Sequence, residues 1–340
     1  MLSCAVCVSP ACRREGAKAE VLRALIEQVV VPNTSAVAES SRRLDGEIAR
    51  LGAEPAITTL RAAREQWQRA LLTWKRADAF RSGPIMDTNS LLRVMFWPVR
   101  GAAVEELVQG SQVIDDASVD VMGVHLGGLF ALECLLYSGQ TDEQIAAGFT
   151  APAGERRARL ARSLASNVSR YADRAAHALG DGQAYAAKFA DGGQDSVNRL
   201  VGQLVHTVED VSASRLARIS DLAKRGRLEA KEVEGGGSRM SQQIALSYLK
   251  ATEQLYLGVD RGLRELVKAQ SASIDDGLRT AFRQSITAVS GLGLPLEEVA
   301  QQDPAGLDAA TGAVKKLERA LRTELASALG AMTFSSLDGD

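Results

Sequence analysis

The chain has 340 residues, of which 46% are hydrophobic, so it can bury a substantial core in one large domain or two. Only 4% are aromatic, and the apolar content is mostly Leu, Ala and Val, a mixture that favours helix over strand. The formal net charge is −2 with acids and bases interleaved, which argues against a nucleic-acid partner. No uncharged apolar run is long enough to predict a transmembrane span.

The N-terminal segment 1–16 is short, apolar and rich in small residues. It contains Cys4, Cys7 and Cys12. We interpret it as a disordered terminus or the remnant of a secretory or lipoprotein signal, and the sequence leaves open whether any of the three cysteines is lipidated. A metal knuckle is the alternative, but a fourth ligand is missing.

The first half of the chain shows helical periodicity almost throughout. A helix is predicted over 17–51, with a kink at Pro32, and a second over 58–80. A loop then leads to a short helix that ends at Met95 and to the break "FWPVRG". Further helices are predicted over 120–137, 141–149 and 155–179.

The glycine-rich stretch 180–193 is the predicted hinge between two halves. Beyond it, helices are expected over 196–224, 241–257, 260–270, 274–292 and 308–329. No stretch alternates convincingly with a period of two. The prediction is therefore an all-α protein with two bundles of about four helices each, one over 17–185 and one over 186–340.

The apolar stretch "GVHLGGLFALECLLYSG" within 120–137 contains one acidic residue, Glu133. Gly127 and Gly128 would let a neighbouring helix approach closely. A buried carboxylate is costly unless an arginine, a hydrogen-bond network, a metal ion or a ligand compensates it. The candidate arginines for a buried pair are Arg81, Arg93 and Arg100.

Four segments in this order resemble the imelysin family of bacterial periplasmic or surface proteins. They are "WKRADAFRSGPIMDTNSLLRVMFWPVRG", "GGLFALECLLYSG", "EGGGSRMSQQIALSYLKATEQLYLG" and "ALRTELASALGAMTFSSLDGD". The resemblance spans nearly the whole chain from about residue 17. It implies an all-helical fold of two bundles related by duplication, a functional site between them, and for many members a role in iron uptake.

Some members of that family are classed as metallopeptidases because of a Gly-x-His-x-x-Glu motif, in which His and Glu can share a metal ion. In this chain Gly128 and Glu133 match the motif, but Phe130 stands in the place of the histidine. On a continuous helix His125 would lie roughly 12 Å along the axis from Glu133, too far for one ion to touch both. Glu133 therefore looks like the retained half of a family site.

Two further groups of residues are candidates. His206 and Glu209 lie three residues apart on the helix predicted over 196–224, a spacing that suits a metal but also arises by chance on exposed faces. Arg81, Trp97 and Arg100 either fix turns between helices or gather around Glu133 and line a cleft between the bundles.

Together these observations predict an exported, non-catalytic component of iron uptake that binds a ligand or a membrane-associated partner in the cleft around Glu133. Periplasmic or lipid-anchored placement in a bacterial envelope is expected. No cofactor is assigned, with a divalent metal or iron as the candidates. The alternatives are an imelysin-type metallopeptidase, which the missing histidine disfavours, and a helical scaffold for a membrane receptor.

Overall fold

The computed structural model describes residues 10–137, 141–150 and 154–332. Every regular element in these ranges is a helix, and no strand occurs within them. The predicted all-α fold is therefore confirmed. None of the helices in these ranges is long and apolar enough to cross a bilayer.

The first group of helices is built on three long elements. Helix α2 (Val31–Ala53) packs between α3 (Ile57–Asp78) and α10 (Gly154–Leu179). Helix α1 (Pro10–Leu25) runs into α2 through the π-helical segment η1 (Ile26–Val30). The shorter elements are α4 (Pro84–Asp87), α5 (Ser90–Met95), α6 (Gly101–Gln109), α7 (Asp116–Val121), the 3-10 turn η2 (Val124–Leu126), α8 (Gly128–Leu136), α9 (Asp142–Gly148) and α11 (Gln183–Asp191).

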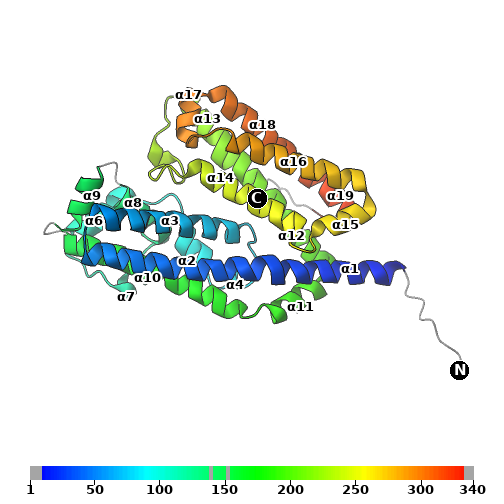
Figure 1. The fold of residues 1–340 in the computed structure, drawn as a ribbon, viewed down its shortest axis with the longest axis horizontal. Coiled ribbons are helices and arrows are strands. Elements are labelled where there is room, and N and C mark those ends of the chain that lie inside the picture. The colour runs from blue at the N-terminus through cyan, green and yellow to red at the C-terminus, as the bar shows by residue number, and fades with distance from the viewer. Residues whose placement is uncertain (1–9, 138–140, 151–153, 333–340) are drawn as a thin grey trace.

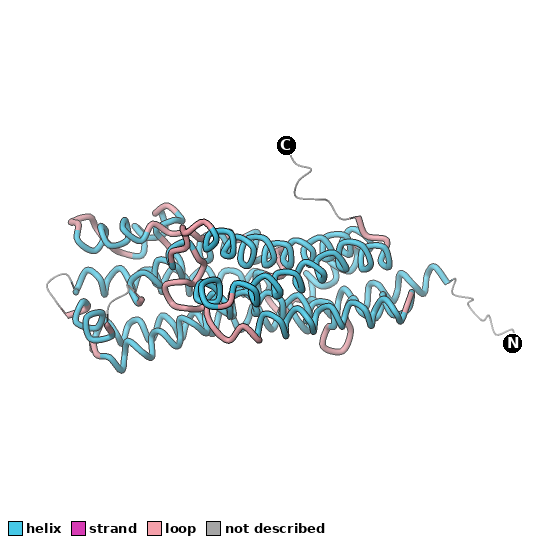
Figure 2. The backbone as a smooth tube through the Cα atoms, turned by 90° about the horizontal axis from the view of Figure 1, so that it is seen from above, coloured by secondary structure: helices cyan, strands magenta, loops and turns pink. Residues whose placement is uncertain are grey.

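The second group lies beside the first in Figure 1, where it occupies the upper part of the view. Helix α14 (Ser241–Leu257) packs on α3 and so joins the two groups. The other elements are α12 (Gly193–Asp210), η3 (Val211–Ala217), α13 (Arg218–Lys224), η4 (Ala230–Glu232), α15 (Leu263–Gln270), α16 (Ala272–Ser290), α17 (Leu296–Gln302), α18 (Pro304–Ala320), η5 (Leu321–Leu325) and α19 (Ala326–Leu329). Figure 2 shows the long helices of both groups running along the long axis of the molecule.

Two tryptophans on α3 anchor the core of the first group. Trp67 and Trp74 are fully buried, and each indole N–H has an acceptor. Nε1 of Trp67 donates to the carbonyl oxygen of Leu129 at 2.8 Å, and Nε1 of Trp74 donates to Oγ of Ser41 at 3.0 Å. Because a buried donor without a partner is costly, these bonds fix α3 against α8 and α2.

The single helix predicted over 120–137 is wrong. The chain instead forms α7, the 3-10 turn η2 and the nine-residue helix α8. Gly127 is extended, and Gly128 has a φ of +70°, a conformation that favours glycine. A Cβ at Gly128 would lie 2.4 Å from the carbonyl oxygen of Val94, so the glycine also permits close approach of α5.

Other boundaries differ from the prediction as well. The proposed hinge 180–193 contains helix α11, so the expected division at 185/186 falls inside a helix that packs on α1. Residues 10–16, expected to be disordered or part of a signal remnant, form the start of α1, whereas residues 1–9 with Cys4 and Cys7 lie outside the described ranges. Helices α6 and α17 were not predicted.

Candidate functional site

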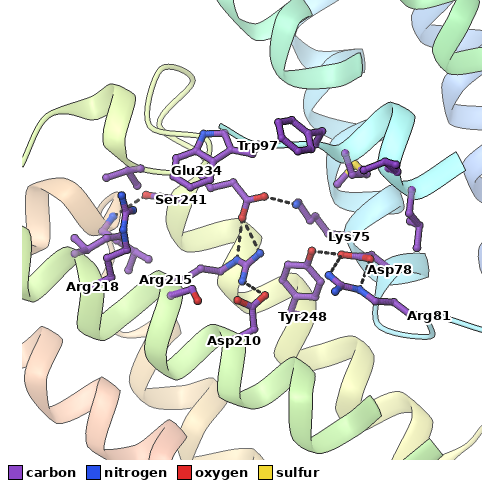
Figure 3. Close-up of a pocket in the computed structure, with 18 of the residues that line it drawn as sticks. Lys75, Asp78, Arg81, Trp97, Asp210, Arg215, Arg218, Glu234, Ser241 and Tyr248 are labelled. Atoms are coloured by element: carbon purple, nitrogen blue, oxygen red, sulfur yellow. Dashed lines mark hydrogen bonds and ion pairs between the residues drawn. The ribbon is translucent and has the colours of Figure 1, made fainter. Parts of the chain in front are cut away.

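A cavity of about 490 Å³ opens where the two groups of helices meet. Helix α3, the segment from α4 through Trp97, η3 with its flanking helices, and α14 provide its walls (Figure 3). Its size lies within the range of small-molecule sites. Its lining combines apolar side chains with four basic residues, Lys75, Arg81, Arg215 and Arg218, and three acidic ones, Asp78, Asp210 and Glu234.

Glu234 lies between two of the cations. Nζ of Lys75 donates to its Oε1 at 2.5 Å, and Arg215 donates to its Oε2 at 2.9 Å. All three side chains are largely buried, and they come from α3, η3 and the loop before α14. Burial alone would raise the pKa of Glu234, but the charges of Arg215 and Lys75 hold the pKa below its ordinary value.

Asp78 and Tyr248 form a second buried contact between the groups. Arg81 donates to both carboxylate oxygens of Asp78 at 2.8 and 3.0 Å, and the Tyr248 hydroxyl from α14 donates to Oδ2. The arginine outweighs burial and lowers the pKa of Asp78. The Arg215 guanidinium lies 4.6 Å from the centre of the Tyr248 ring, which links this contact to Glu234.

Local sequence explains why these charges face inward on α3. Leu71, Lys75 and Asp78 follow helical spacing, and Leu71 and Trp74 on the same side are fully buried. The amphipathic pattern that buries α3 therefore carries two charged residues into the interface with α14. Arg81, just after α3, pairs with Asp78, whereas Glu234, the partner of Lys75, comes from the second group.

Glu133 lies near this cavity but does not line it. It is 7% exposed, and its Oε1 accepts hydrogen bonds from the backbone N–H and the hydroxyl of Ser238 at 2.9 and 2.6 Å. Burial raises the pKa of Glu133 to about 7, helped by the charges of Glu234 and Glu297 and opposed by Ser238. The expected partner from the first half is wrong, because the partner is a serine of the second half.

The other residues predicted around Glu133 are only partly brought together. Arg81 and Trp97 line the cavity, with Trp97 under the guanidinium of Arg218, 5.6 Å from the ring centre. Arg100 is exposed outside the cavity, and its backbone N–H donates to the carbonyl oxygen of His125 at 3.0 Å. His125 lies on η2, beyond the break at Gly127, so the distance along a continuous helix does not apply to it.

The residues present do not fit the metal ion that the family motif implies. Phe130 is fully buried, and the Nζ of Lys75 lies 5.2 Å from the centre of its ring. The motif position of the histidine therefore offers an apolar ring with an ammonium group near it, and no imidazole that could bind a metal. Within the described ranges, no group of three or more His, Cys, Asp or Glu is arranged to hold a metal.

His206 and Glu209 also lack the surroundings of a metal site. His206 is exposed on α12, and Glu209 pairs with Arg322 at 3.3 Å. A metal ion bound by both side chains would need further ligands from other parts of the chain. A charged group that contacts Glu209 is the cation Arg322, which would repel a metal ion. Their metal role stays a prediction.

Sequence reasoning missed most of the charged cluster: Lys75, Asp78, Asp210, Arg215, Arg218, Glu234 and Tyr248. One signal was available, since Lys75 and Asp78 occupy apolar positions of an amphipathic helix. Glu234 lies in a glycine-rich loop, where no periodicity marks it. Its contact with Lys75 joins residues 159 positions apart, which a single sequence cannot reveal.

Comparison with known proteins places this geometry in a family. The structure is similar to an imelysin-like protein from Psychrobacter arcticum (TM-score 0.79, 18% identity, 94% of this chain and 98% of that one). It is also similar to a protein from Parabacteroides distasonis described as a candidate iron-regulated protein A precursor (TM-score 0.78, 15% identity, 93% and 95%). No curated protein matches the sequence. The family model described as Imelysin matches residues 30–324, and the chain therefore belongs to the imelysin family.

Proposed function

We propose that the protein is a non-catalytic, ligand-binding component of iron uptake, with its binding site in the cavity between the two groups of helices. The cavity is the observation that carries this proposal. It has the volume of a small-molecule site, its walls come from both groups, and it combines fixed charges with apolar surface.

The arrangement around Glu133 supports a non-catalytic role. Metal-assisted hydrolysis needs a held ion and a polarised water. Here Phe130, with the ammonium group of Lys75 near its ring, stands where the motif has an imidazole, and Ser238 already binds the carboxylate of Glu133. Glu133 thus contributes to the join between the two halves, next to the loop that carries Glu234.

The link to iron rests on the family and on the name of the Parabacteroides relative. We further propose that the protein acts outside the cytoplasm, in the periplasm or anchored to the envelope. Its partner would be a membrane-associated protein of the same uptake system. The location and the partner do not depend on the cavity, so either can be wrong even if the cavity binds a ligand.

A calorimetric titration of the purified protein with ferric citrate tests the proposal. We expect saturable binding of one equivalent, with weaker binding of iron-free citrate. Incubation with casein in the presence of Zn²⁺ should give no cleavage. Cleavage that a metal chelator abolishes would establish the metallopeptidase instead, and the absence of both binding and cleavage would favour the scaffold.

A further inference from the structure

The charges that line the cavity do not cancel. Lys75, Arg81 and Arg215 are ion-paired with the three acidic residues of the lining, Asp78, Asp210 and Glu234. Four basic and three acidic residues leave a formal excess of one positive charge (4 − 3 = +1), and the residue outside the paired set is Arg218. The ion-pair partner of Arg218, Glu232, lies outside the lining, so Arg218 is the lining cation available to a monoanion.

Arg218 is also the most exposed of the four cations, since its side chain is 39% exposed and that of Arg81, the next, 34%. Its ion pair with Glu232 is long, at 3.4 Å, and both side chains are substantially exposed, 39% and 43%. Such exposed pairs contribute little and exchange readily. A second bond, from Nη1 to the carbonyl oxygen of Glu232 at 2.6 Å, and the ring of Trp97 fix the guanidinium at the edge of the cavity.

Apolar side chains also line the cavity. Met86 and Leu92 line the cavity and are 44% and 53% exposed, which is unusual for large apolar side chains in the described part of the chain. Met95 and Phe96 continue this surface inward. An exposed apolar rim beside a cavity is typical of a ligand site.

We propose that this cavity binds a small organic monocarboxylate. Arg218, held on Trp97, binds the carboxylate, and the apolar body of the ligand lies against Leu92, Met95 and Phe96. The inference rests on the proposed function in that it takes the cavity as the ligand site, but it does not require iron. Arginine suits this task because its planar group binds a carboxylate with two parallel hydrogen bonds.

Fluorescence titration with 2-naphthoate tests the inference directly. Of the three tryptophans, Trp67 and Trp74 are fully buried, so quenching by a ligand at the cavity should come from Trp97. We expect saturable quenching by 2-naphthoate and at least roughly tenfold weaker binding of the neutral 2-naphthamide. Arg218→Gln should weaken 2-naphthoate binding about 10- to 100-fold, and Arg218→Lys should weaken it less.

The matched control is Arg69→Gln, which changes an exposed arginine on α3 that does not line the cavity. It should leave binding unchanged. Thermal melting checks that each variant is folded. Because Trp97→Phe removes the tryptophan whose fluorescence reports binding, the titration of this variant is measured by calorimetry. Equal affinity for naphthoate and naphthamide, unchanged affinity in Arg218→Gln, or no binding of 2-naphthoate, benzoate and octanoate would each overturn the inference. So would tighter binding of inorganic phosphate than of any carboxylate.

The two proposals fail separately. Binding of ferric citrate that Arg218→Gln leaves intact, with no binding of monocarboxylates, would preserve the link to iron and reject the ligand class. Binding of 2-naphthoate that depends on Arg218, without binding of ferric citrate, would support the ligand class and reject the link to iron.

Discussion

Glu133 and Glu234 are buried to a similar degree beside the same interface, yet their surroundings differ. Glu234 meets two cations, Lys75 and Arg215, whereas Glu133 meets the neutral donors of Ser238. The pKa of Glu234 is lowered, and that of Glu133 is raised to about 7. Burial alone therefore does not fix the charge of a carboxyl group; the neighbouring charges decide it.

The comparison also separates two structural roles. Glu234 is a permanent anion that holds two cations in place and completes the paired charges of the cavity. Glu133 can be neutral near pH 7, so it tolerates an apolar helix and still joins the two groups of helices through Ser238.

Glu234→Gln should destabilise the protein most, because it leaves Lys75 and Arg215 buried without their shared anion. Breaking a buried ion pair by removal of one partner costs about 3–5 kcal/mol. Urea denaturation measures the change in unfolding free energy. Glu232→Gln, two residues away and exposed, is the control and should stay within about 0.5 kcal/mol of the parent. Equal effects of the two changes would mean that the buried pairing is unimportant.

Leu132→Ala tests whether the apolar surroundings of Glu133 are tightly packed. Leu132 and Leu136 are fully buried on α8, and truncation of either should cost about 2–5 kcal/mol. Val121, 81% exposed just before η2, provides a control that should change stability by less than about 0.5 kcal/mol. No loss for either leucine in chemical denaturation would contradict the burial of α8.

Glu133→Gln should change the dependence of stability on pH. The folded pKa of about 7 lies above the ordinary 4.5, so between these values the folded state holds the proton more tightly than the unfolded state. The contribution of Glu133 to the stability of the fold is then greatest below about pH 4.5 and is lost as the pH rises through 7. Glutamine can still accept from Ser238 without this loss, so at pH 8 the variant should be more stable by about 3 kcal/mol.

Near pH 4.5 the same variant and the parent should be similarly stable. Denaturation at pH 4.5, 6 and 8 gives the three differences in unfolding free energy. A variant that is less stable than the parent at pH 8 would show that Glu133 is ionised and paired there, as Glu234 is.

Ser238→Ala should have the smallest effect. It removes the hydroxyl donor to Glu133 but keeps the backbone N–H donor, which should cost about 1 kcal/mol at pH 8. Because Ser238 lowers the folded pKa of Glu133, the fall in stability with pH should still begin near pH 4.5 in the variant but continue to a higher pH. Ser290→Ala, at an exposed position near the end of α16, serves as the control. An unchanged pH profile would mean that Ser238 does not set the charge of Glu133.

Local pattern was sufficient for the regular parts of the fold. Helix α14 begins and ends at the predicted residues, Ser241 and Leu257, because its periodicity stops at a glycine-rich loop on one side and at Gly258 on the other. In the segment 120–137 the hydrophobic pattern does not stop where the helix stops, so it predicted one long helix that does not form. Its apolar residues continue across Gly127 and Gly128, and the break depends on the close approach of Val94.

The site was predictable only where the sequence itself looked unusual. Arg81 and Trp97 were named as candidates because they flank breaks between helices, and Glu133 because it interrupts an apolar run; of the three, Arg81 and Trp97 line the cavity. The pairing of Lys75 with Glu234, or of Asp78 with Tyr248, depends on how α3 packs on α14. No local spacing encodes that contact, so the sequence could predict a cleft but not the charges that line it.

The backbone between Asp210 and Arg218 winds more slowly than an α-helix, because η3 is π-helical and its hydrogen bonds span five residues. The wider turn lets two adjacent residues, Ser214 and Arg215, reach the cavity together with Asp210 and Arg218. The segment thus behaves as a one-residue insertion that resets the phase of the helix. Deleting Ala213 would return the segment to an ordinary α-helix, which would leave Asp210 and Arg218 near their present positions but no longer let both Ser214 and Arg215 reach the cavity.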